Sequence, residues 1–507
     1  MRATPLCAAR LPWMAWASVP QGRSWCPVNV IGLEVSTSAA KCVLFSAPEG
    51  IVDAVEVPFP KSVTDKVTQD AEGMVAAALQ ALKCLVGRTT REISALGLAG
   101  TWHSLLLLDG DGRPLGPISL WSDLSAAPSV AQLRKDRGLV QACYQKTGCV
   151  VHATYPVYKY YHLARTSPQK VKQARYVSSQ VEYLYQALTG ERAVSSCTAS
   201  GTGLFNIHSL DWDGELLDLA GLHRDQLGQL REVFHWRGLK ASIAQEVGLK
   251  PGLPVTVGGA DGAMHHVASG GTHGGIMSFS VGTSGAMRLA VDAPWIPEEP
   301  SIWCYYLYGG KRLVGAATNG AANCIDWFLD RWGHGSGGYE DWGRAAAAVD
   351  VETAPIFLPF LYGERCPGWD ENRPGGFVGL KAHHGPAELY YSILEGVLLN
   401  LYQCYLILTE TAGVPEGILV SGGIMHAPFW LQLACDLLGR DLWTTGTKND
   451  STLGAALVAL ASIGGEVETL PGPAPTVVCR PSSTDRTNLY RERFQKYLEL
   501  YQATGTE

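Results

Sequence analysis

Several features typical of membrane, secreted and nucleic-acid-binding proteins are missing from this chain of 507 residues. No uninterrupted apolar run approaches the ~20 residues that a membrane-spanning helix requires. The 13 cysteines form no CxxC pair and are odd in number, which is typical of reduced thiols in a cytosol rather than of a disulfide framework. The net charge of −7 leaves no basic footprint for nucleic acid. We therefore expect a cytoplasmic protein with neither nucleic-acid nor membrane partners.

Two common nucleotide-binding motifs are missing as well. No GxGxxG opens a helix after a strand, which disfavours a nucleotide-dependent redox enzyme. No GxxxxGKS or GxxxxGKT is present, which disfavours a P-loop enzyme. Because the chain is acidic overall, an anionic substrate would have to be captured by a local site rather than by the field of the whole protein.

The chain is long enough for at least two domains, and its 46% hydrophobic and 17% charged residues supply an ample core. Its start differs in composition, because residues 1–28 carry arginines and prolines but no acidic residue. We predict a disordered or spurious extension over 1–28, with a targeting segment as the alternative. Two domains are then predicted, over 29–259 and 260–507.

Strands and helices alternate through both halves, which predicts an α/β architecture. Residues 35–40 read VSTSAA and residues 281–286 read VGTSGA, and each stretch lies between two predicted strands. Such an internal repeat indicates two domains of similar build that each present one turn to a shared ligand.

The stretch from 252 to 287 concentrates the candidate chemistry. The predicted strand PVTVGG leads to Asp261, and the predicted strand IMSFSV leads to Gly282, Thr283 and Ser284. Glycine in such turns lets backbone N–H groups approach an anion closely. A carboxylate beside a phosphate cradle can deprotonate a hydroxyl that attacks a phosphoryl group. Asp-Gly is also common in plain turns, but the rest of the chain favours the catalytic interpretation.

Five motifs, in this order, resemble the FGGY carbohydrate kinases of the actin-like ATPase superfamily: GLEVSTSAAK, AGTWHSLLLLDGDGRPLGP, GGADGA, SFSVGTSGAM and VSGGIMHAPFWLQLACDLLG. The resemblance covers roughly residues 28–503. Within the family, TGCVVHATYPVYK and FLPFLYGERCPGWD look most like gluconokinases, and xylulokinases come second. The resemblance implies two actin-like (ribonuclease H-like) ATPase domains with the active site in the cleft between them. The sugar-binding domain would be 29–259 and the nucleotide-binding domain 260–507.

The resemblance also implies the reaction and its partners. The γ-phosphoryl of ATP, with Mg²⁺, would pass to a terminal hydroxyl of a small sugar or sugar acid, D-gluconate to 6-phosphogluconate being the most similar case. Asp261 would be the general base, and Glu34 would hold Mg²⁺ through water. The residues that would face the nucleotide are Thr37, Ser38, Gly282, Thr283, Ser284, Gly285, Asn319, Gly320, Gly422 and Gly423. The residues expected at the substrate are Trp102, His103, Asp261, Gly262, His152 and Lys159. The resemblance also leaves open the formation of a homodimer.

Departures from the family pattern leave alternatives open. Glu34 and Ser36 stand where the family usually has aspartate and glycine, and Trp102 stands where methionine is usual. The longer carboxylate must still meet the near-octahedral geometry of Mg²⁺, and the indole of Trp102 would narrow the pocket. The alternatives are a xylulokinase-like pentulose kinase and a degenerate regulator that binds sugar or nucleotide without transferring phosphate.

Some polar residues near the predicted pocket allow more than one interpretation. We predict that His152 or Lys159 reaches the carboxylate of gluconate, because a buried carboxylate without a partner is costly. Lys159 could instead open a helix, and His103 taken alone could be a satisfied histidine at a strand end. Glu364 and Arg365 are predicted to form a structural ion pair across their loop.

Overall fold

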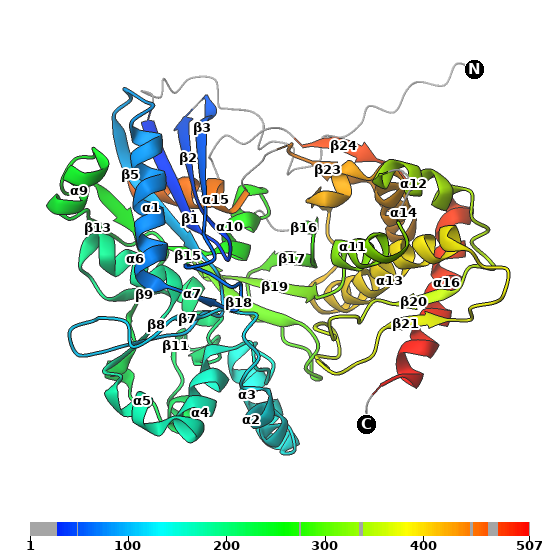
Figure 1. Ribbon diagram of the computed structural model, residues 1–507, viewed down its shortest axis with the longest axis horizontal. Coiled ribbons are helices and arrows are strands. Elements are labelled where there is room, and N and C mark those ends of the chain that lie inside the picture. The colour runs from blue at the N-terminus through cyan, green and yellow to red at the C-terminus, as the bar shows by residue number, and fades with distance from the viewer. Residues whose placement is uncertain are drawn as a thin grey trace.

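The computed structural model describes residues 28–47, 49–272, 275–333, 338–446, 450–464 and 475–505. These residues form two lobes, each built on a sheet, which lie side by side in Figure 1. The predicted extension lies outside the described residues except for Val28, which begins the first strand. The α/β architecture predicted from the alternating strands and helices is confirmed.

The first sheet contains the first of the two similar turns, at residues 35–40, which joins two antiparallel strands. β1 (Val28–Val35) pairs antiparallel with β2 (Ala39–Ala47) and parallel with β5 (Ile93–Gly100). The other strands are β3 (Gly50–Pro58), β13 (Trp236–Gly238), β14 (Pro254–Thr256) and β15 (Gly259–Ala260). The order is β13-β14-β5-β1-β2-β3, and β15 pairs with the end of β5. The chain therefore leaves the edge of this sheet at residue 260, next to the carboxyl end of β5.

Side chains of β1 alternate between two layers, as expected for a buried strand. Ile31 and Leu33 pack with apolar residues of α1 (Ala71–Val86) and α6 (Gln180–Thr189). α1 begins after Asp70, whose side chain accepts a hydrogen bond from the amide of Gly73, a stabilising N-cap. Smaller helices complete this lobe: α2 (Ala127–Leu133), α3 (Arg137–Thr147), α4 (Pro156–Thr166), α5 (Pro168–Gln173), α7 (Ser196–Ser200), α8 (Gly214–Ala220) and α9 (Ala241–Val247).

The second sheet repeats the arrangement of the first. β16 (Ile276–Val281) pairs antiparallel with β17 (Gly285–Val291) and parallel with β22 (Gly417–Ser421). The remaining strands are β18 (Trp303–Tyr308), β19 (Lys311–Thr318), β23 (Leu442–Thr444) and β24 (Thr476–Cys479), in the order β18-β19-β17-β16-β22-β23-β24. The repeat predicted from the two similar turns is confirmed, because each turn joins the same pair of central strands in its own sheet.

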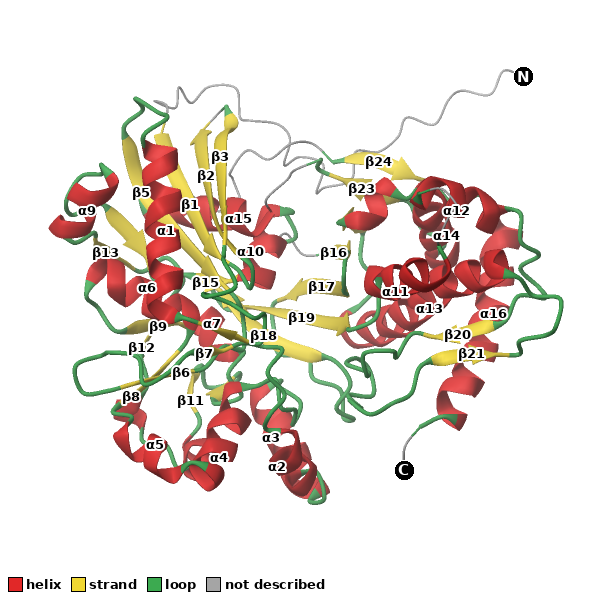
Figure 2. Cartoon of the chain, viewed as in Figure 1, coloured by secondary structure: helices red, strands yellow, loops and turns green. Residues whose placement is uncertain are grey.

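Helices gather on the side of the second sheet away from the first lobe (Figure 2). The longest, α13 (Pro386–Ala412), has the length and composition of a membrane span, yet 78% of its most apolar window is buried inside the protein. It therefore serves as the core helix of this lobe. Around it lie α11 (Ala322–Trp332), α12 (Tyr339–Ala347), α14 (Pro428–Leu438) and α16 (Thr484–Ala503), with a short hairpin of β20 (Ile356–Leu358) and β21 (Gly376–Val378).

Two helices cross between the sheets. α10 (Asp261–Ala268) packs against α15 (Asp450–Ser462), and α15 packs on β1 and β5 of the first sheet. Contact between α15 and β1 is very close, because a Cβ atom at Gly32 would lie 2.0 Å from the carbonyl oxygen of Thr452. Only glycine permits this approach. A helix from the second half of the chain thus covers the sheet of the first.

The described cysteines are small core residues rather than cross-links. All of them are free thiols, and all except Cys84 are buried. Buried free cysteine behaves as a small hydrophobic residue. This agrees with the interpretation of the odd, unpaired set of cysteines as reduced thiols.

Candidate active site

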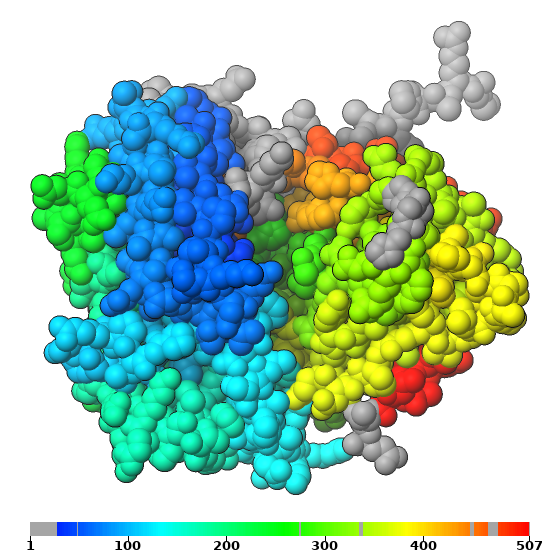
Figure 3. All heavy atoms as spheres, viewed as in Figure 1, coloured from blue at the N-terminus to red at the C-terminus, as the bar shows by residue number. Residues whose placement is uncertain are grey.

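A cavity of about 300 Å³ lies where the two lobes meet. Figure 3 shows the groove that separates the blue and cyan lobe from the green and yellow one. Both halves of the chain contribute to the cavity wall, which consists of Glu34, Thr101, Trp102, His103, Trp121, Asp261, Gly262, His265, Ser284, Arg288, Trp303, Tyr305, Ala317, Arg365 and Ser451. The interdomain cleft expected from the sequence is therefore present, and it contains much of the predicted chemistry.

Asp261 is the first residue of α10, directly after β15. Its Oδ1 atom accepts hydrogen bonds from the amides of Gly262, at 2.7 Å, and of Trp102, at 3.4 Å. Burial raises the pKa of Asp261 to about 6, and the negative charge of Glu34 adds to this effect. A carboxylate with a pKa this close to neutrality can accept a proton from a substrate hydroxyl.

Glu34 lies near the end of β1 and is only 5% exposed. Its Oε2 atom accepts a hydrogen bond of 2.7 Å from Oγ1 of Thr452 on α15. Among the described residues no group of three or more potential ligands gathers around one point. Mg²⁺ usually takes only one or two carboxylates, together with waters and substrate phosphates, so a buried carboxylate at this cavity fits such an ion. The residue that would hold Mg²⁺ is Glu34.

The turns of the two hairpins, at residues 35–40 and 281–286, are held by different hydrogen bonds. In the first, the hydroxyl of Ser36 accepts hydrogen bonds from the amides of Ser38 and Ala39, while Thr37 is half-buried and Ser38 is exposed. In the second, the amide of Gly282 donates to the carbonyl of Ser284 at 2.9 Å. Ser36 thus uses its side chain to stabilise the turn in which the family usually has glycine.

The second hairpin also has exposed turn residues. A Cβ atom at Gly282 would meet no other atom of the described residues within 4 Å, so space is open beside its Cα, although its amide and carbonyl are both bonded within the protein. Ser284 lines the cavity, Thr283 lies beside it in the exposed part of the turn, and Gly285 begins β17. The exposed residues Thr283 and Ser284 can present hydroxyls and amides to an anion.

A second cavity, of about 580 Å³, lies within the second lobe. Its wall is mainly apolar and aromatic, with Ile325 from α11, Tyr390 from α13 and Trp430 from α14. Gly423 lines this cavity, and Gly422 packs so tightly that a Cβ atom would lie 2.5 Å from the carbonyl oxygen of Val281. The predicted adenosine motif therefore lies between this cavity and the second hairpin.

Asn319 and Gly320 form the turn before α11. Neither residue lines either cavity, but Ala322, which begins α11, lines the second one. The side chain of Asn319 donates a hydrogen bond to the carbonyl of Tyr362, and Asn323 donates to the carbonyl of Asn319. Both predicted residues thus shape the start of α11 beside the cavity.

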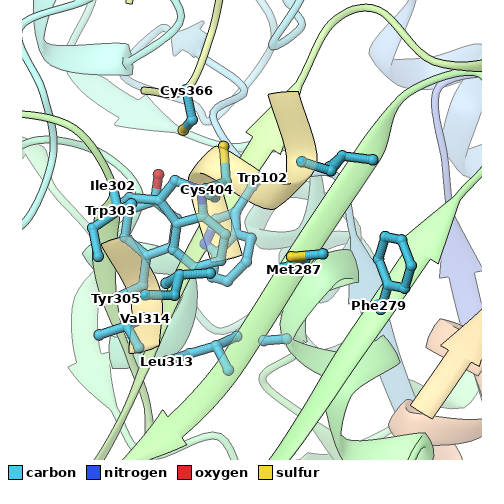
Figure 4. Close-up of a cluster of buried hydrophobic side chains, with 14 of the residues drawn as sticks. Trp102, Phe279, Met287, Ile302, Trp303, Tyr305, Leu313, Val314, Cys366 and Cys404 are labelled. Carbon is cyan, nitrogen blue, oxygen red and sulfur yellow. The ribbon is translucent and has the colours of Figure 1, made fainter. Parts of the chain in front are cut away.

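Aromatic rings form one wall of the first cavity. Trp303 and Tyr305 stack with centroids 4.5 Å apart, and the ring of Tyr305 lies 4.7 Å from that of Trp102. Figure 4 shows the indole of Trp102 beside these two rings. The indole N–H of Trp102 donates to the carbonyl of Cys197 at 3.3 Å. Trp102 is therefore fixed in place, and its ring, which belongs to the first lobe, contacts the ring of Tyr305 in the second lobe.

His103 lines the cavity in a neutral form. Burial lowers its pKa to about 3, and Nδ1 lies 2.6 Å from the carbonyl oxygen of Gly201. Its φ of 63° is uncommon for a residue with a side chain. Lys159 supports this conformation, since its ammonium group donates to the carbonyl oxygens of His103, at 3.1 Å, and of Leu120.

Lys159 and His152 lie behind the cavity wall rather than on it. Both side chains are buried, and neither belongs to the residues that line the cavity. Burial lowers the pKa of Lys159 to about 7, and burial together with the charge of Arg134 lowers the pKa of His152 well below its usual value. This placement does not agree with direct contact between either side chain and a substrate carboxylate. The ammonium group of Lys159 is instead bonded to the carbonyl oxygens of His103 and Leu120.

Two arginines that the sequence interpretation did not select line the cavity. Arg288, on β17, is half-buried, but its Nε and Nη1 atoms are buried and have no hydrogen-bond partner among the described residues, and burial lowers its pKa to about 10. Arg365 also lines the cavity. Its expected partner, Glu364, pairs with Arg373 at 2.6 Å instead. The predicted Glu364–Arg365 ion pair is thus wrong. Arginine directly after the GTSGAM motif is the signal that could have identified Arg288.

Comparison with known proteins places this geometry in one family. The model of the FGGY family of carbohydrate kinases, N-terminal domain, matches residues 29–268, and that of the C-terminal domain matches residues 277–463. The chain belongs to the FGGY family of carbohydrate kinases. The family resemblance is confirmed, and the protein is an ATP-using phosphotransferase with an alcohol group as acceptor.

Relatives of this kinase carry more than one substrate name. A gluconokinase of Bacillus subtilis (strain 168) is 28% identical over 86% of this chain and 88% of its own length. A xylulose kinase of Escherichia coli (strain K12) is 29% identical over 93% of this chain and 98% of its own length. The crystal structure of a gluconate kinase from Lactobacillus acidophilus aligns with a TM-score of 0.89 at 27% identity, over 94% of this chain and 98% of that chain. Sequence identity alone therefore does not choose between the two substrates.

We predict an acidic limb in the pH profile of this kinase. Burial is the main cause that raises the pKa of Asp261 to about 6, so the base becomes protonated as the pH falls below this value. kcat/KM for the sugar should then fall about tenfold per pH unit. Glu34→Gln removes a charge that raises this pKa and should move the limb to lower pH. If the acidic limb of Glu34→Gln lies at the same pH as that of wild type, the charge of Glu34 does not act on the pKa of Asp261.

Proposed function

We propose that this chain is an ATP-dependent gluconokinase, which transfers the γ-phosphoryl group of ATP to the 6-hydroxyl of D-gluconate. The charge pattern of the cavity carries the proposal: Asp261 shares the cavity with two arginines, Arg288 and Arg365. A buried carboxylate needs a cationic or hydrogen-bonding partner. A neutral sugar needs no cationic partner. Arg288 lies beside the reacting end, so the presence of Arg365 as a second arginine in the cavity favours a sugar acid as substrate.

The proposed reaction needs one proton transfer and one displacement. Asp261 takes the proton of the 6-hydroxyl while that oxygen forms a bond to the γ-phosphorus. The bond from this phosphorus to the β–γ bridging oxygen breaks, and ADP leaves with the electron pair. Because both backbone hydrogen bonds to Asp261 end on Oδ1, Oδ2 is the atom proposed to accept the proton.

Arg288 supplies positive charge at the reacting end. A Cβ atom at Gly262 would lie 3.1 Å from Nη2 of Arg288, which places the guanidinium beside the residue that follows Asp261. Charge placed where it develops during transfer lowers the barrier. Bound Mg²⁺ would neutralise charge on the phosphates, and Glu34 would hold it through water.

The remaining cavity wall suits a polyol chain. A volume of about 300 Å³ lies at the lower end of the range for small-molecule sites, about 300–1,000 Å³. Oγ1 of Thr101 and Nε1 of Trp303 are buried, have no hydrogen-bond partner within the described part of the chain, and belong to cavity-lining residues. Unpaired buried groups are costly, and hydroxyl groups of an open-chain substrate would pair them.

Adenosine is proposed to bind in the second cavity. Its aromatic and aliphatic wall suits a planar base, and Gly423 connects it to the second phosphate hairpin. With Thr37 and Ser38 on the first hairpin and Thr283 and Ser284 on the second, the phosphates would lie between the two lobes. Closure of the lobes would exclude water, which otherwise competes for the phosphoryl group.

Two alternatives keep specific support. A xylulokinase-like activity is supported by relatives named xylulose kinase. A regulator without phosphoryl transfer is supported by Glu34 and Ser36, which depart from the usual family residues. Against the regulator, Glu34 and Asp261 line one cavity, and the hydroxyl of Ser36 bonds within its own turn.

The proposed role of Glu34 predicts a changed magnesium requirement. Glu34→Ala should raise the Mg²⁺ concentration for half-maximal rate sharply. Thr452→Val, which keeps the shape but removes the hydroxyl that orients Glu34, should weaken metal affinity about 10–100-fold. A magnesium titration of the initial rate, and of ADP binding by calorimetry, measures both. If Glu34→Ala behaves like wild type, Glu34 is structural and the regulator alternative gains.

The substrate proposal predicts a ranking of kcat/KM. Gluconate should exceed D-xylulose, D-ribulose and glycerol by about 10²-fold or more, because a site built to pair a group rejects analogues that lack it. A coupled assay for ADP measures all four. A neutral pentulose in first place would refute gluconate but not the kinase. Sugar and nucleotide binding without turnover would favour the regulator.

A further inference from the structure

Arg365 is held in the cavity wall by aromatic rings rather than by an anion. It lies in the loop that follows β20, and its guanidinium carbon lies 5.9 Å from the ring centroid of Trp121 and 5.8 Å from that of Trp369. Within the described part of the chain its side chain has no ion pair and no hydrogen bond. Arginine stacked on aromatic rings keeps its planar donors free and oriented. The donors of Arg365 are thus available to a ligand in the cavity.

The loop that carries Arg365 is itself well supported. Glu364 pairs with Arg373 and accepts hydrogen bonds from the amide of Gly368 and the hydroxyl of Tyr501. Further along the loop, Arg134 of the first lobe pairs with Glu371 at 2.9 Å. These bonds engage Glu364 and Glu371, two of the acidic residues of this loop. They fix its loop across the two lobes without neutralising its charge.

The two cavity arginines lie near each other, since the charge of Arg365 contributes to lowering the pKa of Arg288, but each has its own set of neighbours. Arg288 lies beside Gly262, and its charge acts on Asp261 and His265 at the reacting end. Arg365 lies beside Trp121, and its charge adds to burial in lowering the pKa of His103 to about 3. His103 belongs to the wall of the first lobe, where the body of the substrate is expected. Arg365 is therefore placed for the end of the substrate that does not react.

We propose that Arg365 binds the carboxylate of the substrate and selects sugar acids over neutral sugars. This inference rests on the proposed function, because it assumes that the 6-hydroxyl of the same molecule lies at Asp261. The guanidinium can form two parallel hydrogen bonds with a carboxylate. Lys159, which was expected in this role, is occupied by backbone carbonyls.

The test compares two ligands that differ only at one end of the chain. D-Gluconate carries a carboxylate where D-glucitol carries a hydroxymethyl group, so a carboxylate-binding residue distinguishes them. Arg365→Gln should weaken gluconate binding and kcat/KM about 10–100-fold, mainly through KM, because a charge-assisted hydrogen bond is lost. Binding of D-glucitol, and turnover of any neutral sugar, should change less than about twofold. Arg365→Lys, which keeps the charge, should restore part of the gluconate affinity.

Two further variants separate this role from others. Lys381→Gln removes an exposed positive charge from the same lobe and should leave both ligands unaffected. Arg288→Gln should lower kcat for charged and neutral substrates alike. Thermal unfolding of each variant checks that it is folded. If Arg365→Gln does not fold, the ratio of gluconate affinity to D-glucitol affinity in Arg365→Lys tests the inference instead.

Calorimetry of gluconate with the full-length protein separates the inference from the proposed function. Gluconate that binds through Arg365 without turnover would overturn the gluconokinase proposal and leave the inference standing. Failure of wild type to bind gluconate would overturn the inference. The inference would also be wrong if Arg365→Gln weakened the binding of gluconate and of D-glucitol equally. Arg365 would then act on the phosphoryl group or support the cavity wall.

Discussion

The close contact between α10 and α15 is the constraint on which the active site depends. α15 lies on the first sheet because Gly32 has no side chain to keep it away, and a Cβ atom at Gly454 of α15 would lie 2.0 Å from the carbonyl oxygen of Met264 on α10. The two helices therefore cross with their backbones nearly touching. This crossing brings Asp261, at the start of α10, and Glu34, at the end of β1, to one cavity between the lobes.

Burial at this cavity has opposite effects on acids and bases, as expected when the charged form loses water. It raises the pKa of Asp261 to about 6, and it lowers the pKa of His103 and of His265 to about 3. The histidines are therefore neutral near pH 7, where Asp261 is the carboxyl poised to exchange a proton. Arg288 keeps its charge, so the cavity combines a base with a permanent cation beside it.

Sequence patterns predicted the parts of the site that are local. The hairpin turns and Asp261 are predicted because glycines and a carboxylate follow apolar strands within a few residues, a pattern that is visible in the local sequence. The predicted pairing of Arg365 with Glu364 is wrong because Glu364 pairs instead with Arg373, a contact that no local pattern reveals. Lys159 was expected at the ligand because its charge is visible in the sequence, whereas the carbonyls that bind it are brought there only by folding.

The central claim is that Asp261 acts as the base for phosphoryl transfer from ATP to gluconate. Replacement of Asp261 by asparagine keeps the size of the side chain and the hydrogen bonds to Oδ1, but it removes the group that accepts the proton. A rapid-quench measurement of the transfer step, with ATP binding measured in parallel, tests this most directly. The account predicts unchanged ATP affinity and a transfer rate lower by about 10²–10⁴-fold. A transfer rate close to that of wild type would contradict it.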